Sequence, residues 1–257
     1  MRVALVVVCL GIIVLLCWLA FRTATGMFSR NPMYEIVNLD IDTTSQVVKE
    51  YMRGEFKIRR GGNLFGFNIQ KARRTFFKFA PHYRSMEITR VLPDTLKISL
   101  VERQPVAQLG QRGGYAVDIE KRVFNKRNRK HLLPVIVGYK GPILKPGERL
   151  SGLAADAITV IEALVDTDEA GVIVVSGVDV GGNDKSRPDA LRLYLKGNVI
   201  VDLWWKRTKE GAANEDLRHR LADLASWVAS STESGRKLKV VTLLTDDPTK
   251  NAFTFWD

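Results

Sequence analysis

The sequence predicts an α+β protein in which an apolar amino-terminal helix precedes two compact units. Three observations support this prediction. The chain opens with an uncharged apolar run, its middle mixes short β-rich stretches with amphipathic helical patterns, and its charge changes sign in mid-chain. Mixed helix and strand patterns of this length are typical of small α+β domains, and a shift in charge indicates two units with different surfaces.

The apolar run covers residues 3–21 and contains no charged side chain. A helix of this length spans roughly 28 Å, close to the thickness of the hydrocarbon core of a bilayer. We therefore expect a transmembrane helix over residues 3–21, with a cytoplasmic tail of residues 1–2. Residues 22–33 hold several helix-breaking residues and are expected to form a linker.

A cleaved signal peptide is the alternative interpretation of this run. Arg2 and residues 24–26 fit the charged start and the small-residue cleavage site of such a peptide. The run is longer than the apolar part of a signal peptide, and Trp18 and Phe21 resemble interfacial anchors. Length favours a retained anchor.

The side of the membrane on which the rest of the chain lies is not fixed by charge, because few basic residues flank the run. Both cysteines, Cys9 and Cys17, lie inside the run, so the remainder of the chain has none. That remainder cannot form disulfides or thiolate zinc sites, and its composition suits an oxidising compartment.

The net charge of +11 is unevenly distributed. Residues 49–140 carry 21 Lys or Arg against 7 Asp or Glu, whereas residues 141–257 carry 15 against 18. The densest basic stretch, residues 121–130, is interpreted as a solvated hairpin loop. A basic surface attracts anionic headgroups, an acidic partner or nucleic acid, but nucleic-acid binding needs stacking aromatics or a docking element beside the charges.

The first unit, residues 34–103, has the predicted order β-α-α-β-β. Thr43 and Gln46 have the spacing of a capping box, and Asn68 can cap the second helix. The two last strands alternate apolar and polar residues and form a hairpin. In chain order, we expect the five elements at residues 34–42, 44–53, 69–77, 83–91 and 96–102.

The second unit, residues 104–257, is predicted to be a mixed β domain with two helices. The helices have apolar residues at helical spacing, and Gly197-Asn198 has the composition of a two-residue hairpin turn. The helices are expected at residues 153–164 and 217–228. The strands are expected at residues 106–109, 115–118, 123–124, 133–137, 172–180, 191–196, 199–205, 239–244 and 252–256, the last two flanking a turn at Asp246-Asp247-Pro248.

The sequence carries no motif for catalysis, for a metal or for a cofactor. The three histidines, His82, His131 and His219, lack metal-ligand spacing, and nucleophile, phosphate-binding and dinucleotide patterns are absent. The SxxK form at residues 234–237 and the carboxylate pair at residues 246–247 fit polar turns. Nothing in the sequence therefore points to a catalytic site.

The last strand-forming segment is the candidate binding site. It comprises Ala252, Phe253, Thr254, Phe255 and Trp256. An edge strand there would offer unpaired backbone groups to a partner's strand, whereas an inner strand would not, and the sequence supports both equally. We expect charge or proline substitution at Phe253 or Phe255 to abolish partner binding. Trp227, on a predicted amphipathic helix, is interpreted as a core residue.

Four short motifs lie near the junction of the two units. They are R-V-L-P-D-T-L at residues 90–96, V-E-R-Q-P-V-A at 101–107, V-D followed by V-F between 117 and 124, and L-P-V-I-V-G at 133–138. In order and spacing they resemble motifs of the FtsQ/DivIB family of bacterial cell-division proteins. Lys121 stands where that family usually has glycine, so the turn before Val123 is expected to differ.

The resemblance implies a POTRA domain over residues 34–103 and an FtsQ-type β domain over residues 104–257. It implies a single-pass protein of the cell inner membrane, with both domains in the periplasm. It further implies a non-enzymatic scaffold that binds an FtsB/FtsL-like pair, links divisome proteins at the septum and regulates septal peptidoglycan synthesis. The partner edge then falls at residues 252–256.

Two other classes remain as alternatives at this point. One is a POTRA-containing envelope protein of transport or assembly, and the other is an anchored envelope enzyme. A cluster of His, Asp and Glu side chains in a deep pocket would favour the enzyme.

Overall fold

The computed structural model describes residues 2–29, 31–110, 114–125, 133–167, 171, 173–182, 187–207, 214–245 and 251–256. Within the first helix, side chains are described for residues 10–20, 23 and 27–29. The chain divides into two compact units, Met1–Glu102 and Arg103–Asp257. The predicted turn at Asp246-Asp247-Pro248 and residues 126–130 of the basic stretch lie outside the described residues.

The first helix, α1, spans Arg2–Ser29 and includes the whole apolar run. It continues through most of the predicted linker; a short 3-10 helix, Pro32–Tyr34, follows it. Across the part of the chain that the structure describes, no helix combines the length and hydropathy needed to cross a bilayer. The predicted transmembrane helix is therefore not confirmed.

The first unit has the predicted order β-α-α-β-β. Four of its elements, α2, α3, β2 and β3, agree with the predicted ranges within three residues, whereas the first strand is shorter than predicted. After α1, the elements are β1 (Asn38–Asp42), α2 (Gln46–Glu55), α3 (Ile69–Phe79), β2 (Tyr83–Val91) and β3 (Thr95–Glu102).

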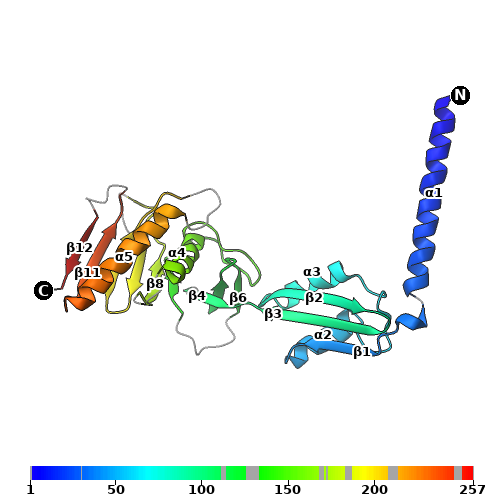
Figure 1. The fold of residues 1–257 in the computed structure, drawn as a ribbon, viewed down its shortest axis with the longest axis horizontal. Coiled ribbons are helices and arrows are strands. Elements are labelled where there is room, and N and C mark those ends of the chain that lie inside the picture. The colour runs from blue at the N-terminus through cyan, green and yellow to red at the C-terminus, as the bar shows by residue number, and fades with distance from the viewer. Residues whose placement is uncertain are drawn as a thin grey trace. The chain divides into compact units, whose positions relative to one another are not determined.

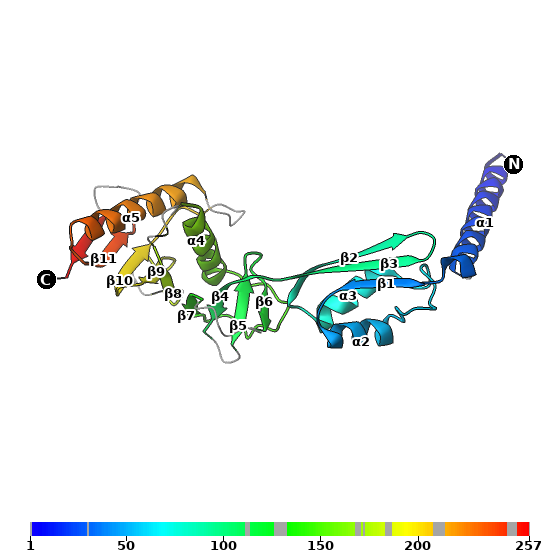
Figure 2. The ribbon, with the colours of Figure 1, turned by 60° about the horizontal axis from the view of Figure 1, so that its bottom comes forward.

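The three strands of this unit form a sheet in the order β1-β3-β2, with β1 parallel and β2 antiparallel to the central strand. Both helices lie on one face of the sheet, as Figure 2 shows. Met52 of α2 and Phe76 of α3 are fully buried against Leu96 and Ile98 of β3. The neighbouring residues of β3 are exposed, so the sheet buries one face only.

The two predicted helix caps had different outcomes. Asn68 Oδ1 accepts a hydrogen bond from Lys71 N at 2.9 Å, which confirms the cap of α3. The capping box of α2 is wrong. Ser45 is the N-cap residue and its side chain makes no capping bond, whereas Thr43 Oγ accepts from Ser45 N and lies 3.1 Å from the Tyr83 hydroxyl. A hydroxyl that closes a local turn and bonds a core tyrosine is not available for a cap.

The second unit is built from nine strands and two helices. The helices are α4 (Leu153–Thr167) and α5 (Glu215–Glu233). The strands are β4 (Pro105–Leu109), β5 (Tyr115–Asp118), β6 (Val123–Asn125), β7 (Val135–Val137), β8 (Val175–Asp179), β9 (Leu191–Leu195), β10 (Val199–Leu203), β11 (Leu238–Leu243) and β12 (Ala252–Phe255).

All nine strands join one sheet in the order β12-β11-β10-β9-β8-β7-β4-β5-β6. Figures 1 and 2 show α4 and α5 on the same face of this sheet. The core lies between them: Ile158 of α4, Leu221 of α5 and Val201 of β10 are fully buried. Along β9 buried and half-buried residues alternate, which is the pattern of a sheet covered on one face.

Two hairpin turns of this sheet depend on residues with positive φ. Gly197 and Asn198, at φ +92° and +64°, close β9 onto β10 as the sequence predicted. Lys121, before β6, has φ +64°. Lys121 thus adopts the left-handed conformation that glycine adopts more easily, and the expectation that this turn differs from that of the family stays a prediction.

Candidate partner-binding edge

The structure places the predicted binding segment on β12, the outermost strand at one end of the nine-stranded sheet. Figure 1 shows β12 beside β11, close to the carboxyl terminus. Phe253 pairs with Val241 and Thr254 with Val240, antiparallel, and a bulge follows near Leu238. Among the described strands, β11 is the only neighbour of β12. The sequence left edge and inner strand open, and the fold resolves this in favour of the edge.

Two hydrogen bonds show which backbone groups of β12 point outward. Trp256 N donates to Lys237 O at 2.9 Å, so the backbone of Trp256 faces β11. Leu243 O accepts from Trp204 N at 2.9 Å, so Leu243, and by alternation Val241, faces β10 instead. Backbone groups alternate in direction along a strand, so Thr254 faces β11 as Trp256 does, whereas Phe253 faces the other way. The second bond agrees, because Val241, the partner of Phe253, also points away from the shared ladder. The N–H and C=O groups of Phe253 face away from the sheet.

This outward row is what a partner strand requires. Unpaired N–H and C=O groups on an edge strand are a template for another strand, and pairing supplies main-chain hydrogen bonds. We refer to β12 with its outward backbone groups as the open edge.

Aromatic side chains lie along the open edge. The Phe253 ring is 5.2 Å from the Trp227 ring of α5 and 5.5 Å from the Phe255 ring, measured between centroids. Phe253 is 43% exposed and Trp256 is 48% exposed. Exposed aromatics beside a free strand edge provide the large apolar contacts that anchor protein interfaces.

Two cations complete the surface. The Arg236 guanidinium lies 5.6 Å from the Phe255 ring centroid, and the Lys239 ammonium lies 4.7 Å from that of Trp256. Both basic residues are exposed. Each orders an aromatic ring by a cation–π contact and leaves its charge accessible to solvent.

A buried arginine of α5 holds the strand to which β12 is paired. Arg220 is 6% exposed. Its Nε donates to Asp216 at 2.9 Å, and its terminal nitrogen donates to Thr245 O at 2.8 Å, just beyond the end of β11. This contact fixes the end of β11 against the helix, so the open edge rests on a rigid support.

An ion pair on the face of the sheet opposite the helices holds β9 and β10 in register. Arg192 of β9 and Asp202 of β10 are cross-strand partners, and the two side chains form a fork with nitrogen–oxygen distances of 2.7 and 3.0 Å. The hydrogen bond to Asp202 raises the pKa of Arg192 above its usual value. A bidentate pair of this kind fixes geometry as well as adding attraction.

The other end of the sheet, at β6, is covered. Val123 N donates to Glu148 O at 2.9 Å, and Val123 O accepts from Gly147 N at 2.7 Å. Leu150 N donates to Lys121 O at 2.7 Å. The loop that contains residues 147–150 therefore satisfies the outward backbone groups of Val123. We refer to this end as the covered edge.

Four of the five predicted site residues form β12, and Trp256 follows it directly. Sequence reasoning missed Arg236 and Lys239, which the fold brings, together with Trp227, to the same surface. Trp227 also packs against the core, so its interpretation as a core residue is confirmed but incomplete. In the described ranges, no three His, Cys, Asp or Glu side chains are grouped as metal ligands would be.

A small β-α-α-β-β unit followed by a broad sheet defines the class: a protein of two α+β units, the second of which ends in the open edge. Comparison with known proteins makes this more specific. Residues 35–103 match the family described as POTRA domain, FtsQ-type.

Three curated relatives are cell-division proteins. The chain is 28% identical over 166 residues to cell division protein FtsQ of Neisseria meningitidis serogroup B, covering 63% of this chain and 66% of that protein. It is 26% identical to FtsQ of Neisseria gonorrhoeae, covering 64% of that protein, and 21% identical over 203 residues to cell division protein DivIB of Clostridium acetobutylicum, covering 79%.

The matched segment thus spans about two thirds of the length of the two FtsQ relatives. The POTRA match and the three relatives confirm the resemblance to the FtsQ/DivIB family seen in the motifs at the junction. They support a role in cell division.

Proposed function

We propose that the chain is a non-enzymatic scaffold of the division apparatus and that it binds its partner by strand addition at the open edge. The observation that carries this proposal is the outward-facing backbone of Phe253 on an outermost strand flanked by exposed aromatics. Strand addition uses these elements: main-chain hydrogen bonds give affinity, and side-chain contacts give specificity.

The partner we propose is an FtsB/FtsL-like pair of membrane division proteins. The relatives with which the chain shares most of its length are cell-division proteins, which supports partners from that process. By linking such a pair to other divisome proteins at the septum, the chain would regulate septal peptidoglycan synthesis. We propose that the POTRA unit, residues 35–103, binds further membrane division proteins.

We further propose that α1 anchors the chain in the inner membrane and that both units lie in the periplasm. The central side chains of α1 are apolar and more than half exposed, for example Ile13 at 57% and Leu16 at 61%. A bilayer would cover such an apolar surface. Lipid offers no hydrogen-bond partners to the backbone, but a helix needs none, because its N–H and C=O groups bond one another. Protease added to spheroplasts should therefore degrade both units.

Depletion of the protein followed by complementation tests this function. Depleted cells are expected to grow as undivided filaments, and the wild-type gene should restore division. A Phe253→Pro variant that accumulates to wild-type level should fail to restore it and should fail to retain the purified FtsB/FtsL pair. Normal division in depleted cells would refute the cell-division role, whereas normal division with the Phe253→Pro variant would refute only the site.

A further inference from the structure

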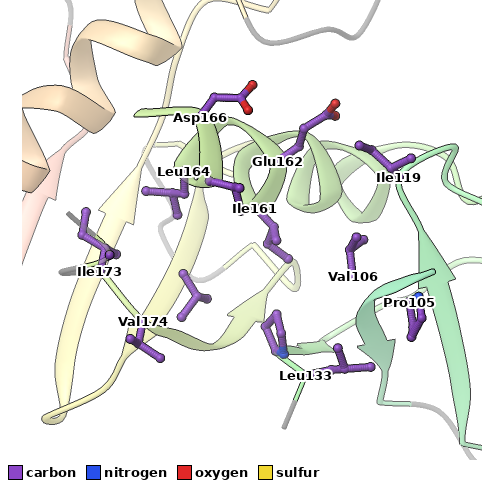
Figure 3. A pocket seen from close by; sticks show the side chains of 14 residues that line it. Pro105, Val106, Ile119, Leu133, Ile161, Glu162, Leu164, Asp166, Ile173 and Val174 are labelled. Atoms are coloured by element: carbon purple, nitrogen blue, oxygen red, sulfur yellow. The ribbon is translucent and has the colours of Figure 1, made fainter. Parts of the chain in front are cut away.

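A cavity lies in the second unit, Arg103–Asp257, which we call the β unit, away from the open edge. It is an open cavity of about 630 Å³ under the carboxyl-terminal half of α4. In Figure 3, Ile161 and Leu164 project toward it from α4, and Leu133 lies on the opposite side. Val106 of β4 and Val174, before β8, complete the apolar lining.

The cavity exists because one strand starts late. Val135 of β7 pairs with Gln108 of β4 and with Gly177 of β8, so these three strands run side by side from this point. On the amino-terminal side, Pro134 precedes β7. Proline has no N–H to donate, so the ladder cannot extend past it. The starts of β4 and β8 therefore project beyond β7, and the space between them is left open beneath α4.

Apolar side chains at the mouth of the cavity are exposed to an unusual degree. Val165 is 76% exposed on a helix whose other apolar residues are mostly buried. Val174 is 50% exposed and Ile119 is 43% exposed. Contiguous exposed apolar surface around a concave site marks a place where a ligand or partner binds.

The charge beside the mouth selects among possible occupants. Glu162 and Asp166 flank Val165 on α4, and Figure 3 shows both carboxylates directed away from the cavity, on the outer side of the helix. Among the described residues, neither carboxylate forms an ion pair. Lys121 lies near Glu162 and offsets part of its charge, so an occupant that leaves the cavity across α4 meets two carboxylates with a reduced negative charge. A fatty acid or an anionic phospholipid would be repelled there, whereas lysine or arginine would be attracted.

We infer that this cavity binds an apolar peptide segment of a partner protein, flanked by basic residues. The inference goes beyond the proposed function and rests on the cavity alone. In the sheet order, β8 lies four strands from β12, which is about 19 Å at the usual spacing between strands. The two sites are therefore separate, and the chain can hold a partner at each of them at the same time.

Fluorescence polarisation with a synthetic probe tests this inference. The full-length chain is placed in phosphatidylcholine nanodiscs, which carry no net charge. The probe is a dye-labelled peptide with a Leu/Ile centre and a pair of lysines at each end. The matched peptide has glutamates in place of the lysines. We expect the lysine probe to bind on the order of tenfold more tightly than the glutamate probe.

Variants of the chain locate the binding. Val165→Asp, at an exposed position, should weaken lysine-probe binding about tenfold, whereas the control Ile143→Asp, at a residue 85% exposed and outside the cavity, should not change it. The double variant Glu162→Lys, Asp166→Lys should invert the preference between the probes and leaves the cavity intact. Binding of the FtsB/FtsL pair at the open edge should stay unchanged in all three variants.

Several results would overturn the inference. Equal affinity for both probes, or binding that survives Val165→Asp and the double charge reversal, would refute it. So would phosphatidylglycerol vesicles that bind the chain and are released by Val165→Asp, because a lipid would then be the occupant. If only a chain with residues 126–132 replaced by a Gly/Ser segment binds the probe, the chain's own residues fill the site and no partner does.

Discussion

The two ends of the nine-stranded sheet differ. At β6 a loop covers the outermost strand, whereas at β12 no described backbone segment lies on the outer side of the strand. Both end strands are short: β6 spans Val123–Asn125 and β12 spans Ala252–Phe255. At the covered edge, Val123 bonds Gly147 and Glu148. At the open edge, the equivalent groups of Phe253 face outward.

The difference separates an edge whose outward backbone groups are satisfied within the chain from the edge at which we propose that a partner binds. A bare strand edge invites pairing with other chains, and natural proteins usually cover it. In this chain the loop at residues 147–150 covers the edge at β6. In the described residues β12 is left uncovered, with exposed Phe253 and Trp256 along it, which is consistent with the binding role that we propose for this edge. Four changes break or sharpen this comparison.

The largest effect is expected at the covered end. Arg103 forms an ion pair with Asp118 of β5, and the two side chains are 7% and 3% exposed. Asp118 also accepts a hydrogen bond from Arg122 N at 2.8 Å, at the turn before β6. Arg103→Ala leaves a buried carboxylate without its cation, so we expect the free energy of unfolding of the β unit to fall by about 3–5 kcal/mol. Urea denaturation measures this.

Two controls test whether the loss of stability comes from this buried ion pair: removal of an exposed arginine elsewhere, and replacement of both partners of the pair. Arg218→Ala, at an exposed position of α5, should change stability little. Replacing both partners with apolar residues, Arg103→Met and Asp118→Leu, should restore most of the loss. Affinity for the FtsB/FtsL pair should stay unchanged under conditions where the variants are folded. A loss of affinity would show that the two ends are not independent.

The second effect is expected at the open edge itself. Phe253→Pro removes a side chain and an outward N–H, whereas Phe253→Ala removes only the side chain. The outward N–H has no partner within the sheet, so its loss should cost no ladder bond. In the complex, a partner carbonyl would be left without a donor, which costs about 1–3 kcal/mol. We expect the proline variant to bind about 10–100-fold more weakly than the alanine variant.

Thr254→Pro is the matched control for backbone direction. Thr254 faces β11, so proline there removes a ladder bond and should lower stability, which Phe253→Pro should not. Amide exchange of Val240 and Thr242, the residues of β11 that face β12, reports this difference. If Phe253→Pro and Thr254→Pro destabilise the unit equally, the assignment of outward and inward groups on β12 is wrong.

Local signals in the sequence predicted the elements well. The alternation over Tyr83–Val91 gave β2 to the residue, and that over residues 96–102 gave β3 within one residue, because the sheet of the first unit buries one face. The cap at Asn68 was also correct, since its partner Lys71 is close in the chain. Helix α5 was predicted too short: its last turn contains Ser and Thr residues, which carry no apolar periodicity.

The order of strands could not be predicted in the same way. That β12 is outermost depends on β10 and β11 pairing in parallel across α5, a contact between residues far apart in the chain. The site was therefore only half predictable. Its strand could be located by composition, but its exposure, and its contact with Trp227, depend on long-range packing. The capping box failed for the same reason, because Tyr83 competes for Thr43.

A smaller effect is expected from Trp227, which supports Phe253 from the helix. Trp227→Ala removes an aromatic pair worth about 0.5–1.5 kcal/mol and leaves the Phe253 ring without a fixed position. We expect the affinity for the FtsB/FtsL pair to fall about threefold to tenfold, measured by titration calorimetry. Trp227→Phe, which keeps an aromatic ring, should retain most of the affinity. An unchanged affinity in Trp227→Ala would place the helix outside the interface.

The smallest effect is expected from Lys239, whose ammonium lies over the Trp256 ring. An exposed cation–π contact contributes about 0.5–1 kcal/mol, so Lys239→Ala should weaken binding of the pair about twofold to fivefold. Lys239→Arg keeps the contact and should bind like the wild type. Salt distinguishes two origins of the effect: if the lysine acts only through the ring, the loss persists at high ionic strength, whereas a direct attraction to an acidic partner would be screened. Equal binding by all three proteins at low and high salt would exclude this residue from the open edge.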